Sequence, residues 1–166
     1  MLECLIIGDS IAQGAAAALR AALFDRCAIV AEQGISSSRV ARIIPAEAFN
    51  TAAISAGSND ADSPALPDRL AQLRAGVSAR YVLWIMPYHR RAAQIVRATA
   101  ARYGDNVIDL AELPTRDHLH PASYQGLGVA LARGGYAGQP RYSSASARAA
   151  PNPASAANPS PNVFRR

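Results

Sequence analysis

The chain has 166 residues, half of them apolar, which is enough for one domain with a full hydrophobic core. All 17 basic residues are arginines; five lie beyond Ala132, and the twelve that remain equal the 12 acidic residues, so the net charge of +5 belongs to the C-terminal segment. A formally neutral body is not typical of nucleic-acid binding, and no apolar run reaches the length that spans a membrane. We therefore expect a cytoplasmic protein without a membrane span and without specific nucleic-acid binding.

The last segment, residues 133–166, differs in composition from the rest of the chain. It is rich in Gly, Pro, Ser, Ala and Asn, and it contains no acidic residue. Such a composition buries too little apolar surface to offset the entropy of ordering. We expect residues 1–132 to form the domain and 133–166 to be a disordered tail. Its spaced arginines are available to an acidic partner, but they do not form the dense block of a typical binding patch.

Cys4 and Cys27 both lie in apolar segments. Neither belongs to a C-x-x-C pattern, and no histidines are spaced around them as in a zinc site. We expect two buried free thiols and no metal site.

Short apolar runs alternate with longer amphipathic stretches along the body of the chain, which is typical of parallel strands connected by helices. This rhythm predicts a three-layer α/β/α sandwich around a parallel sheet. The expected strands are residues 4–7, 27–31, 51–56, 81–86 and 106–110. The expected helices are residues 11–24, 37–44, 66–75 and 90–103, followed by a last helix that begins at Pro121 and ends before Gly134. Trp84, inside the fourth strand, is expected in the core.

The motif Gly8-Asp9-Ser10 follows the first apolar run and precedes an alanine-rich helix. It therefore places a serine at the carboxyl end of a buried strand, where active sites of α/β sheets usually lie. A serine hydroxyl is a poor nucleophile unless a base removes its proton and an acid orients that base. We expect Asp9 to brace the turn by hydrogen bonding.

Histidine is the usual base, and the chain has three: His89, His118 and His120. Asp117 and His120 are spaced so that one turn can fold the carboxylate back onto Nδ1 of the imidazole, leaving Nε2 to face Ser10. His118 is the rival base, but it follows Asp117 directly and such a neighbour tends to point away. A helix-capping turn is the alternative interpretation of this segment.

Ester chemistry also needs donors aimed at the oxygen on which negative charge develops. The third strand is followed by Gly57-Ser58-Asn59-Asp60, which brings the Asn59 amide to the same sheet edge as Ser10. The second strand is followed by Gly34, whose N–H is unobstructed, although an ordinary turn accounts for this glycine equally well. We expect Asp60 to be structural.

Taken together in this order and spacing, these motifs and the segment Asp117-x-x-His120-Pro121 resemble the SGNH (GDSL) hydrolase family. The resemblance extends over residues 2–132 and implies a flavodoxin-like fold with a five-stranded sheet. It implies that Ser10 is the nucleophile and that His120 is the base, oriented by Asp117. It further implies an oxyanion hole formed by the N–H groups of Ser10 and Gly34 and by the Asn59 side chain. No metal or organic cofactor is required.

The expected function is hydrolysis of carboxylic esters through an acyl-enzyme on Ser10. The segments between the motifs are short, so we expect an open cleft for acetyl or other short acyl esters of a small molecule or a carbohydrate. A lysophospholipase or thioesterase acting on longer chains is an alternative, as is an acyltransferase with the same catalytic residues. A non-catalytic binding module that works through the basic tail is the alternative from another class. Residues 88–91 are open to two interpretations, a cleft wall or a solvated helix start.

Overall fold

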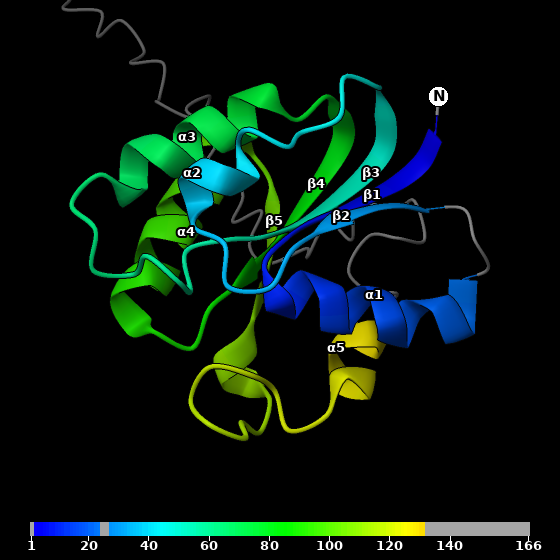
Figure 1. Cartoon of the computed structure of the whole chain (residues 1–166), viewed down its shortest axis with the longest axis vertical. Helices are drawn as coiled ribbons and strands as arrows, with labels where there is room; N and C mark the ends of the chain where they lie inside the picture. The colour runs from blue at the N-terminus through cyan, green and yellow to red at the C-terminus, as the bar shows by residue number, and fades with distance from the viewer. Residues whose placement is uncertain (1, 24–26, 132–166) are drawn as a thin grey trace, which may run out of the picture.

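The computed structural model describes residues 2–23 and 27–131, which form an α/β sandwich (Figure 1). Its five-stranded sheet is parallel throughout, with the strand order β2-β1-β3-β4-β5. The strands are β1 (Leu2–Gly8), β2 (Cys27–Ala31), β3 (Phe49–Ser55), β4 (Ala79–Met86) and β5 (Asn106–Asp109). This is the flavodoxin-like order, in which ligands bind at the carboxyl ends of the strands on either side of the β1/β3 boundary. The predicted fold class is confirmed.

Helices cover both faces of the sheet. They are α1 (Ser10–Leu23), α2 (Ser37–Val40), α3 (Leu66–Gly76), α4 (Arg90–Tyr103) and α5 (Tyr124–Leu131), with a 3-10 turn η1 (Leu110–Glu112) after β5. In Figure 1, α1 and α5 lie on one side of the sheet, and α2, α3 and α4 lie on the other. Within the described residues, no helix is long and apolar enough to cross a membrane. The predicted tail, 133–166, lies outside those residues.

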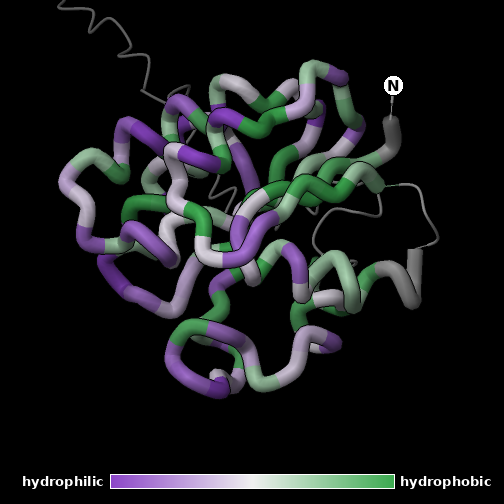
Figure 2. Tube along the Cα trace, viewed as in Figure 1, coloured by the Kyte–Doolittle hydropathy of each residue, from purple (hydrophilic) through white to green (hydrophobic). Residues whose placement is uncertain are grey.

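Two hydrophobic clusters hold these layers together, because successive side chains of a strand point to opposite faces. Ile54 and Trp84 belong to the cluster shared with α3 and α4, whereas Ala53 and Ile85 belong to the one shared with α1 and α5. Figure 2 shows hydrophobic residues along the central strands and hydrophilic residues on the outer turns. Trp84 is 0 % exposed, which confirms its predicted place in the core.

Two helices differ from the sequence-based expectation. α2 ends at Val40 and does not continue to residue 44. After Val40 the chain continues in tight turns, in which the N–H groups of residues 42 and 43 donate to carbonyls three residues earlier, and Pro45 disfavours helical backbone angles at Ile44. α5 begins at Tyr124 and not at Pro121, because Pro121 forms an antiparallel bridge with Thr115. The bridge closes the loop that carries Asp117 and His120.

The expectation of two free thiols is wrong, because Cys4 and Cys27 form a disulfide. The two residues are direct partners in the register of β1 and β2, with a Cα–Cα distance of 4.5 Å. That spacing lies within the range in which a disulfide can form. The bridge therefore links the edge strand of the sheet to the strand that leads to Ser10.

Gly8 makes the turn into α1 possible. Its φ is +147°, and a Cβ atom there would collide with the carbonyl oxygen of Ser55 in β3. The Asp9 N–H donates to that same carbonyl at 3.2 Å, and the Glu32 N–H donates to the Gly8 carbonyl at 3.1 Å. The ends of β1, β2 and β3 are thus held side by side, with Ser10 as the first residue of α1.

Candidate active site

Ser10, His120 and Asp117 lie in one chain of contacts at the carboxyl edge of the sheet. Ser10 Oγ is 3.0 Å from Nε2 of His120, and Nδ1 of the same ring is 2.8 Å from Oδ2 of Asp117. The structure therefore brings together the three residues predicted to act on the substrate. Of the two neighbouring histidines, it is His120 and not His118 whose ring contacts both Ser10 and Asp117; His118 is exposed, with φ at 63°.

The protonation of this chain follows from the Asp117 carboxylate. The hydrogen bond from the His120 ring, together with those from the backbone N–H groups of His120 and Leu119, holds the pKa of Asp117 well below its usual value of 3.8. An ionised carboxylate only accepts hydrogen bonds. Nδ1 of His120 therefore carries the proton and donates a hydrogen bond to Asp117. Nε2 then remains as an acceptor for the Ser10 hydroxyl, as a general base requires.

The loop around Asp117 is a compact turn built on its own hydrogen bonds. Asp117 Oδ1 accepts from the N–H groups of Leu119 at 3.0 Å and of His120 at 2.6 Å. Thr115 Oγ1 accepts from the His118 N–H at 2.8 Å and lies 2.9 Å from the His120 carbonyl, to which it donates. The sequence analysis did not predict a role for Thr115. Its position two residues before Asp117 in a loop was the available signal of a threonine that stabilises a turn.

Asn59 and Gly34, the predicted oxyanion donors, lie on loops after β3 and β2. Asn59 Nδ2 donates to the Ile35 carbonyl at 3.0 Å, which connects the two loops. An amide nitrogen carries two N–H groups, so a second remains for an oxyanion. Gly34 is exposed and has a φ of +74°, a left-handed conformation that suits glycine. Their role as an oxyanion hole stays a prediction.

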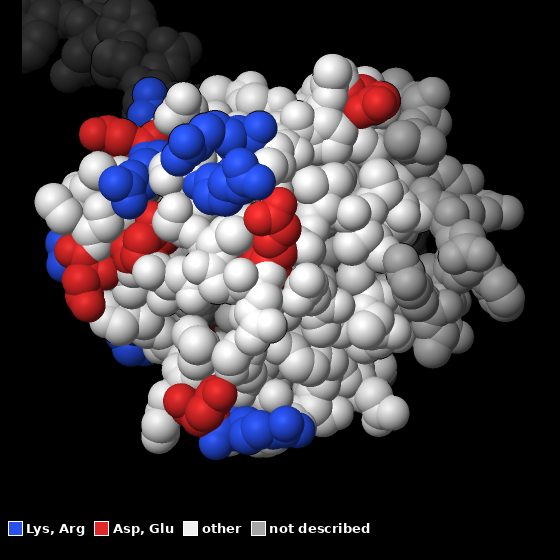
Figure 3. Space-filling model, in the orientation of Figure 1, with Lys and Arg blue, Asp and Glu red and all other residues white. Residues whose placement is uncertain are grey.

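Asp60, in the same loop as Asn59, contacts the helices α2 and α3. Its carboxylate accepts from the N–H of Ser37 at 3.2 Å and from the Ser37 hydroxyl at 2.9 Å, and it pairs with Arg69 of α3 at 3.0 Å. Figure 3 shows arginine side chains gathered over α2 and α3 on this face. The Arg69 charge on that face is therefore compensated by a carboxylate.

Comparison of the fold with solved structures gives several matches at low sequence identity. The C-terminal catalytic domain of peptidoglycan O-acetyltransferase A from Streptococcus pneumoniae matches with a TM-score of 0.52 at 18% identity, over 75% of this chain and 84% of that domain. Est24, a carbohydrate acetylesterase from Sinorhizobium meliloti, matches with a TM-score of 0.57 at 12% identity, over 80% and 99% of the two chains. The aryl esterase of M. smegmatis matches with a TM-score of 0.56 at 16% identity, over 80% and 97%.

The chain has the SGNH-hydrolase fold. No family model matches the sequence, and no curated protein matches it. The resemblance drawn from the motifs is thus confirmed at the level of the fold. In the described part of this SGNH fold, no cluster of His, Cys, Asp and Glu could hold a metal ion.

Within this SGNH fold, Asp9 is a buried carboxyl group beside Ser10. Its Oδ1 accepts from the N–H of Ile11 at 3.0 Å, which caps α1, and from the hydroxyl of Ser55 at 2.8 Å. Asp9 Oδ2 and Ser58 Oγ are also buried, and among the described residues neither makes a hydrogen bond of ordinary geometry. Burial raises the pKa of Asp9 above 3.8, and the hydrogen bonds from Ser55 and Ile11 offset only part of that increase.

The raised pKa makes the stability of the protein depend on pH in a definite direction. A group whose pKa is higher in the folded state stabilises the fold below its unfolded pKa, and it loses this contribution as the pH rises through the folded value. We expect Asp9→Asn, which keeps the acceptor for Ile11 and Ser55 but does not titrate, to gain stability relative to wild type as the pH rises from 3 towards 8. Urea unfolding of both proteins across this range measures the difference. A constant difference, or one that falls with pH, would contradict the assignment.

Tyr124, which the sequence analysis did not single out, lies between α1 and the loop of His120. Its ring packs on Gly14, one helical turn after Ser10, where any Cβ atom would collide with it. Burial raises the pKa of Tyr124, and the charges of Asp9 and Asp117 raise it further. The available signal was a glycine inside a helix at the position that follows Ser10 by four residues.

A shallow groove of about 410 Å³ runs beside α1 on the side of β2. It is lined by Gln13, Ala16, Ala17, Ile29 and Ala31. Gln13 crosses it, donating from Nε2 to the Ala31 carbonyl at 3.2 Å. Because Gln13 and Ala17 follow Ser10 by three and seven residues, the groove lies along the face of α1 that begins at Ser10.

Proposed function

We propose that this protein is a serine hydrolase that cleaves carboxylic esters through an acyl-enzyme on Ser10, with acetyl and other short acyl esters as its substrates. The observation that carries the proposal is the chain of contacts from Ser10 Oγ to His120 Nε2 and from His120 Nδ1 to Asp117. Two of the similar structures are esterases and one is an O-acetyltransferase, which supports chemistry on ester bonds.

The proposed reaction has two steps with one set of groups. In the first, Ser10 Oγ attacks the ester carbonyl carbon while its proton moves to Nε2 of His120. The Ser10 and Gly34 N–H groups and the Asn59 amide stabilise the oxyanion, and His120 then gives the proton to the leaving alcohol. In the second, His120 takes a proton from water, whose oxygen attacks the acyl carbon. His120 then returns the proton to Ser10 Oγ as the bond between Ser10 and the acyl carbon breaks and the acid is released. Asp117 stays ionised and orients the imidazole throughout.

The proposed preference for short acyl groups rests on the openness of the site. The side chains of His120 and Asp117 are 27% and 48% exposed, so the site lies at the surface and not at the bottom of a tunnel. The groove beside α1 favours longer acyl chains as the second candidate, because four of its five lining side chains are apolar and it lies along the helix that begins at Ser10. An alcohol acceptor in place of water would make the same residues an acyltransferase.

We expect kcat/KM on p-nitrophenyl acetate to exceed that on p-nitrophenyl octanoate by at least about 10-fold, because an open site provides little apolar surface to bind the longer chain. Initial rates on the two esters measure this ratio. An inverse ratio would favour a lysophospholipase or thioesterase. Formation of the acyl ester of an added alcohol would identify an acyltransferase. A non-catalytic module would turn over neither ester.

Deletion of residues 134–166 is expected to leave the turnover unchanged, whereas a module that binds through its tail would lose its function.

The cytoplasmic location expected from the sequence stays a prediction. The Cys4–Cys27 disulfide speaks against a cytoplasmic location, because disulfides persist in oxidising compartments and are rare in the cytosol. An acidic partner of the tail likewise stays a prediction.

A further inference from the structure

The loop that carries Asp117 and His120 is a closed unit. The N–H of Ala122 donates to the Pro114 carbonyl at 2.8 Å, and the N–H of Arg116 donates to the His120 carbonyl at 2.9 Å. With the bridge between Thr115 and Pro121, these bonds join the beginning of the loop to its end. A unit held together by its own bonds can still shift as a whole relative to Ser10. Its position therefore depends on what holds it to the sheet.

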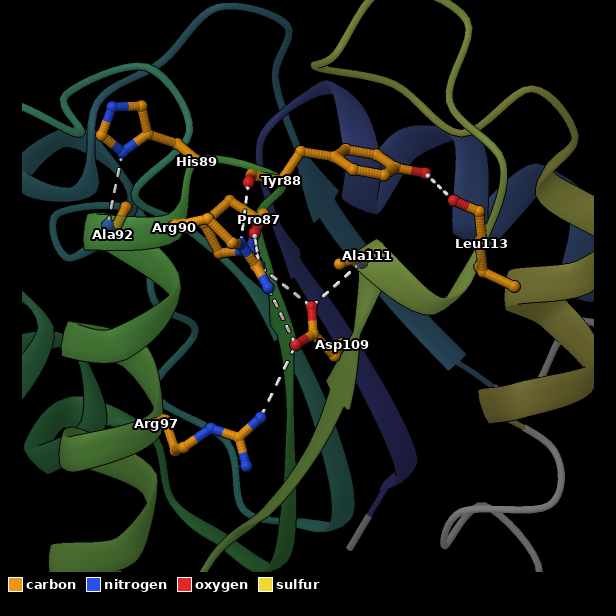
Figure 4. A network of polar contacts seen from close by, with 9 residues as sticks. All are labelled: Pro87, Tyr88, His89, Arg90, Ala92, Arg97, Asp109, Ala111 and Leu113. Carbon is orange, nitrogen blue, oxygen red and sulfur yellow. Dashed lines mark hydrogen bonds and ion pairs between the residues drawn. The ribbon is translucent and has the colours of Figure 1, made fainter.

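Tyr88, which follows the end of β4, contacts the beginning of this unit. Its hydroxyl donates to the carbonyl oxygen of Leu113 at 3.2 Å (Figure 4) and shares its proton with the carbonyl oxygen of Pro114, also at 3.2 Å. Burial raises the pKa of Tyr88, the charge of Asp117 raises it further, and a hydrogen bond with Thr115 opposes the increase. The phenol therefore lies beside the two carbonyls with which the loop begins.

The backbone of Tyr88 is itself held in place by Arg90, the first residue of α4. Arg90 Nε donates to the Tyr88 carbonyl at 3.1 Å, and Nη2 donates to the Pro87 carbonyl at 2.8 Å. The guanidinium also makes two hydrogen bonds with Asp109 at the end of β5, at 3.0 and 3.1 Å. Figure 4 shows this network, which joins the residues after β4 to the last residue of β5.

Asp109 extends the network towards the loop of His120. Its Oδ1 accepts from the Ala111 N–H at 3.0 Å and so caps η1, which leads into Leu113. Burial alone would raise the pKa of Asp109, but the hydrogen bonds from Arg90 and Ala111 and the charges of Arg90 and Arg97 lower it. Asp109 therefore stays ionised and keeps Arg90 in place. Residues 88–91 are thus not a solvated helix start alone, since Tyr88 and Arg90 both have defined partners.

We propose that Tyr88 is a positioning residue for catalysis, whose hydroxyl holds the loop of Asp117 and His120 at the distance at which Nε2 meets Ser10 Oγ. The inference rests on the proposed ester hydrolysis and concerns the same site. The hydroxyl of Tyr88 donates to the Leu113 and Pro114 carbonyls and not to Ser10, His120 or Asp117, so in this proposal it acts through those two carbonyls. A misplacement of about 1 Å in a catalytic group costs on the order of 100-fold in rate.

The inference predicts a dependence on the leaving group. An alkoxide must receive a proton from His120 as it leaves, whereas p-nitrophenolate is a stable anion and leaves without one. In the acylation step, a displaced His120 therefore impairs one proton transfer with p-nitrophenyl acetate and two with ethyl acetate, whereas deacylation of the acetyl-enzyme is the same for both esters. We expect Tyr88→Phe to lower kcat/KM, which reports acylation, about 10-fold on p-nitrophenyl acetate and about 100-fold on ethyl acetate.

Tyr103→Phe is the matched control, because Tyr103 is a half-exposed tyrosine at the end of α4 whose hydroxyl donates to Ala71 at 3.5 Å. We expect both of its rates to equal those of wild type. Losses in Tyr88→Phe that are equal on the two esters, or smaller than 2-fold on both, would overturn the proposal.

A second readout is independent of activity. Relaxation of the backbone amide nitrogens by NMR is expected to show larger motions of residues 115–120 in Tyr88→Phe than in wild type, with α4 unchanged. Equal motions in the two proteins would overturn the inference even if neither ester were a substrate. A wild-type protein that hydrolyses neither ester would instead contradict the proposed function, so the two failures are distinguishable.

Discussion

Replacement of Ser10 by alanine is expected to lower kcat on p-nitrophenyl acetate by about 10⁵- to 10⁶-fold, because no other group can form the acyl-enzyme. The substitution removes one hydroxyl and leaves a good helix-forming residue at the start of α1, so we expect the fold to persist. Rates at saturating ester, together with the mass of the protein after treatment with a fluorophosphonate, measure the effect. Wild type should gain one adduct and Ser10→Ala none.

Ser78→Ala is the control for this substitution. Ser78 is exposed and precedes β4, at the edge of the sheet opposite to Ser10. The Ser78→Ala substitution should leave both the rate and the labelling by the fluorophosphonate at wild-type values. If Ser10→Ala keeps more than a small fraction of the rate, the nucleophile is another residue and the proposed function fails.

Replacement of Asp117 by asparagine is expected to lower kcat by about 10³- to 10⁴-fold, because the amide no longer holds His120 in the tautomer that accepts a proton from Ser10. An asparagine oxygen can still accept from the N–H groups of Leu119 and His120, so the turn itself should survive. Rates on p-nitrophenyl acetate and thermal unfolding of the same samples separate the loss of chemistry from a loss of structure.

The control for this second substitution is Asp62→Asn. The Asp62 carboxylate is 86% exposed and lies 3.6 Å from His89, in the loop after β3. We expect no change in rate from it. A rate for Asp117→Asn within 10-fold of wild type would mean that Asp117 serves mainly to shape the turn, as in the alternative interpretation of the segment.

Much of the fold follows from local patterns in the sequence. The apolar runs near residues 27–31 and 81–86 become β2 and the buried part of β4, and the amphipathic pattern of residues 90–103 becomes α4 with the same bounds. These elements are predictable because a strand buried on both faces reads as a continuous apolar run, and a helix on a sheet has one apolar face. The end of α2 was predicted too late, at residue 44; Pro45 excludes only Ile44 from a helix and does not explain the end at Val40.

The composition of the candidate site also follows from sequence, because the ends of parallel strands lie at one edge of the sheet. Ser10, Asn59 and His120 each follow a predicted strand or precede a predicted helix, and so they were expected at the same edge. The contact of Ser10 with His120 at 3.0 Å agrees with that expectation. The choice between His118 and His120 was also in the sequence, as a matter of spacing from Asp117.

Other features depended on which segments meet in space. Cys4 and Cys27 become a disulfide because β1 and β2 pair in that register, and no local pattern encodes the register of two strands. Tyr88 belongs to the site only because the residues after β4 lie against those after β5, and Tyr124 only because α5 packs on Gly14. The sequence by itself therefore determined most of the elements and the candidate reacting groups, since these follow from periodicity and spacing. The tertiary structure decided the contacts that position those groups, because side chains far apart in the chain meet only when the sheet and its helices pack together.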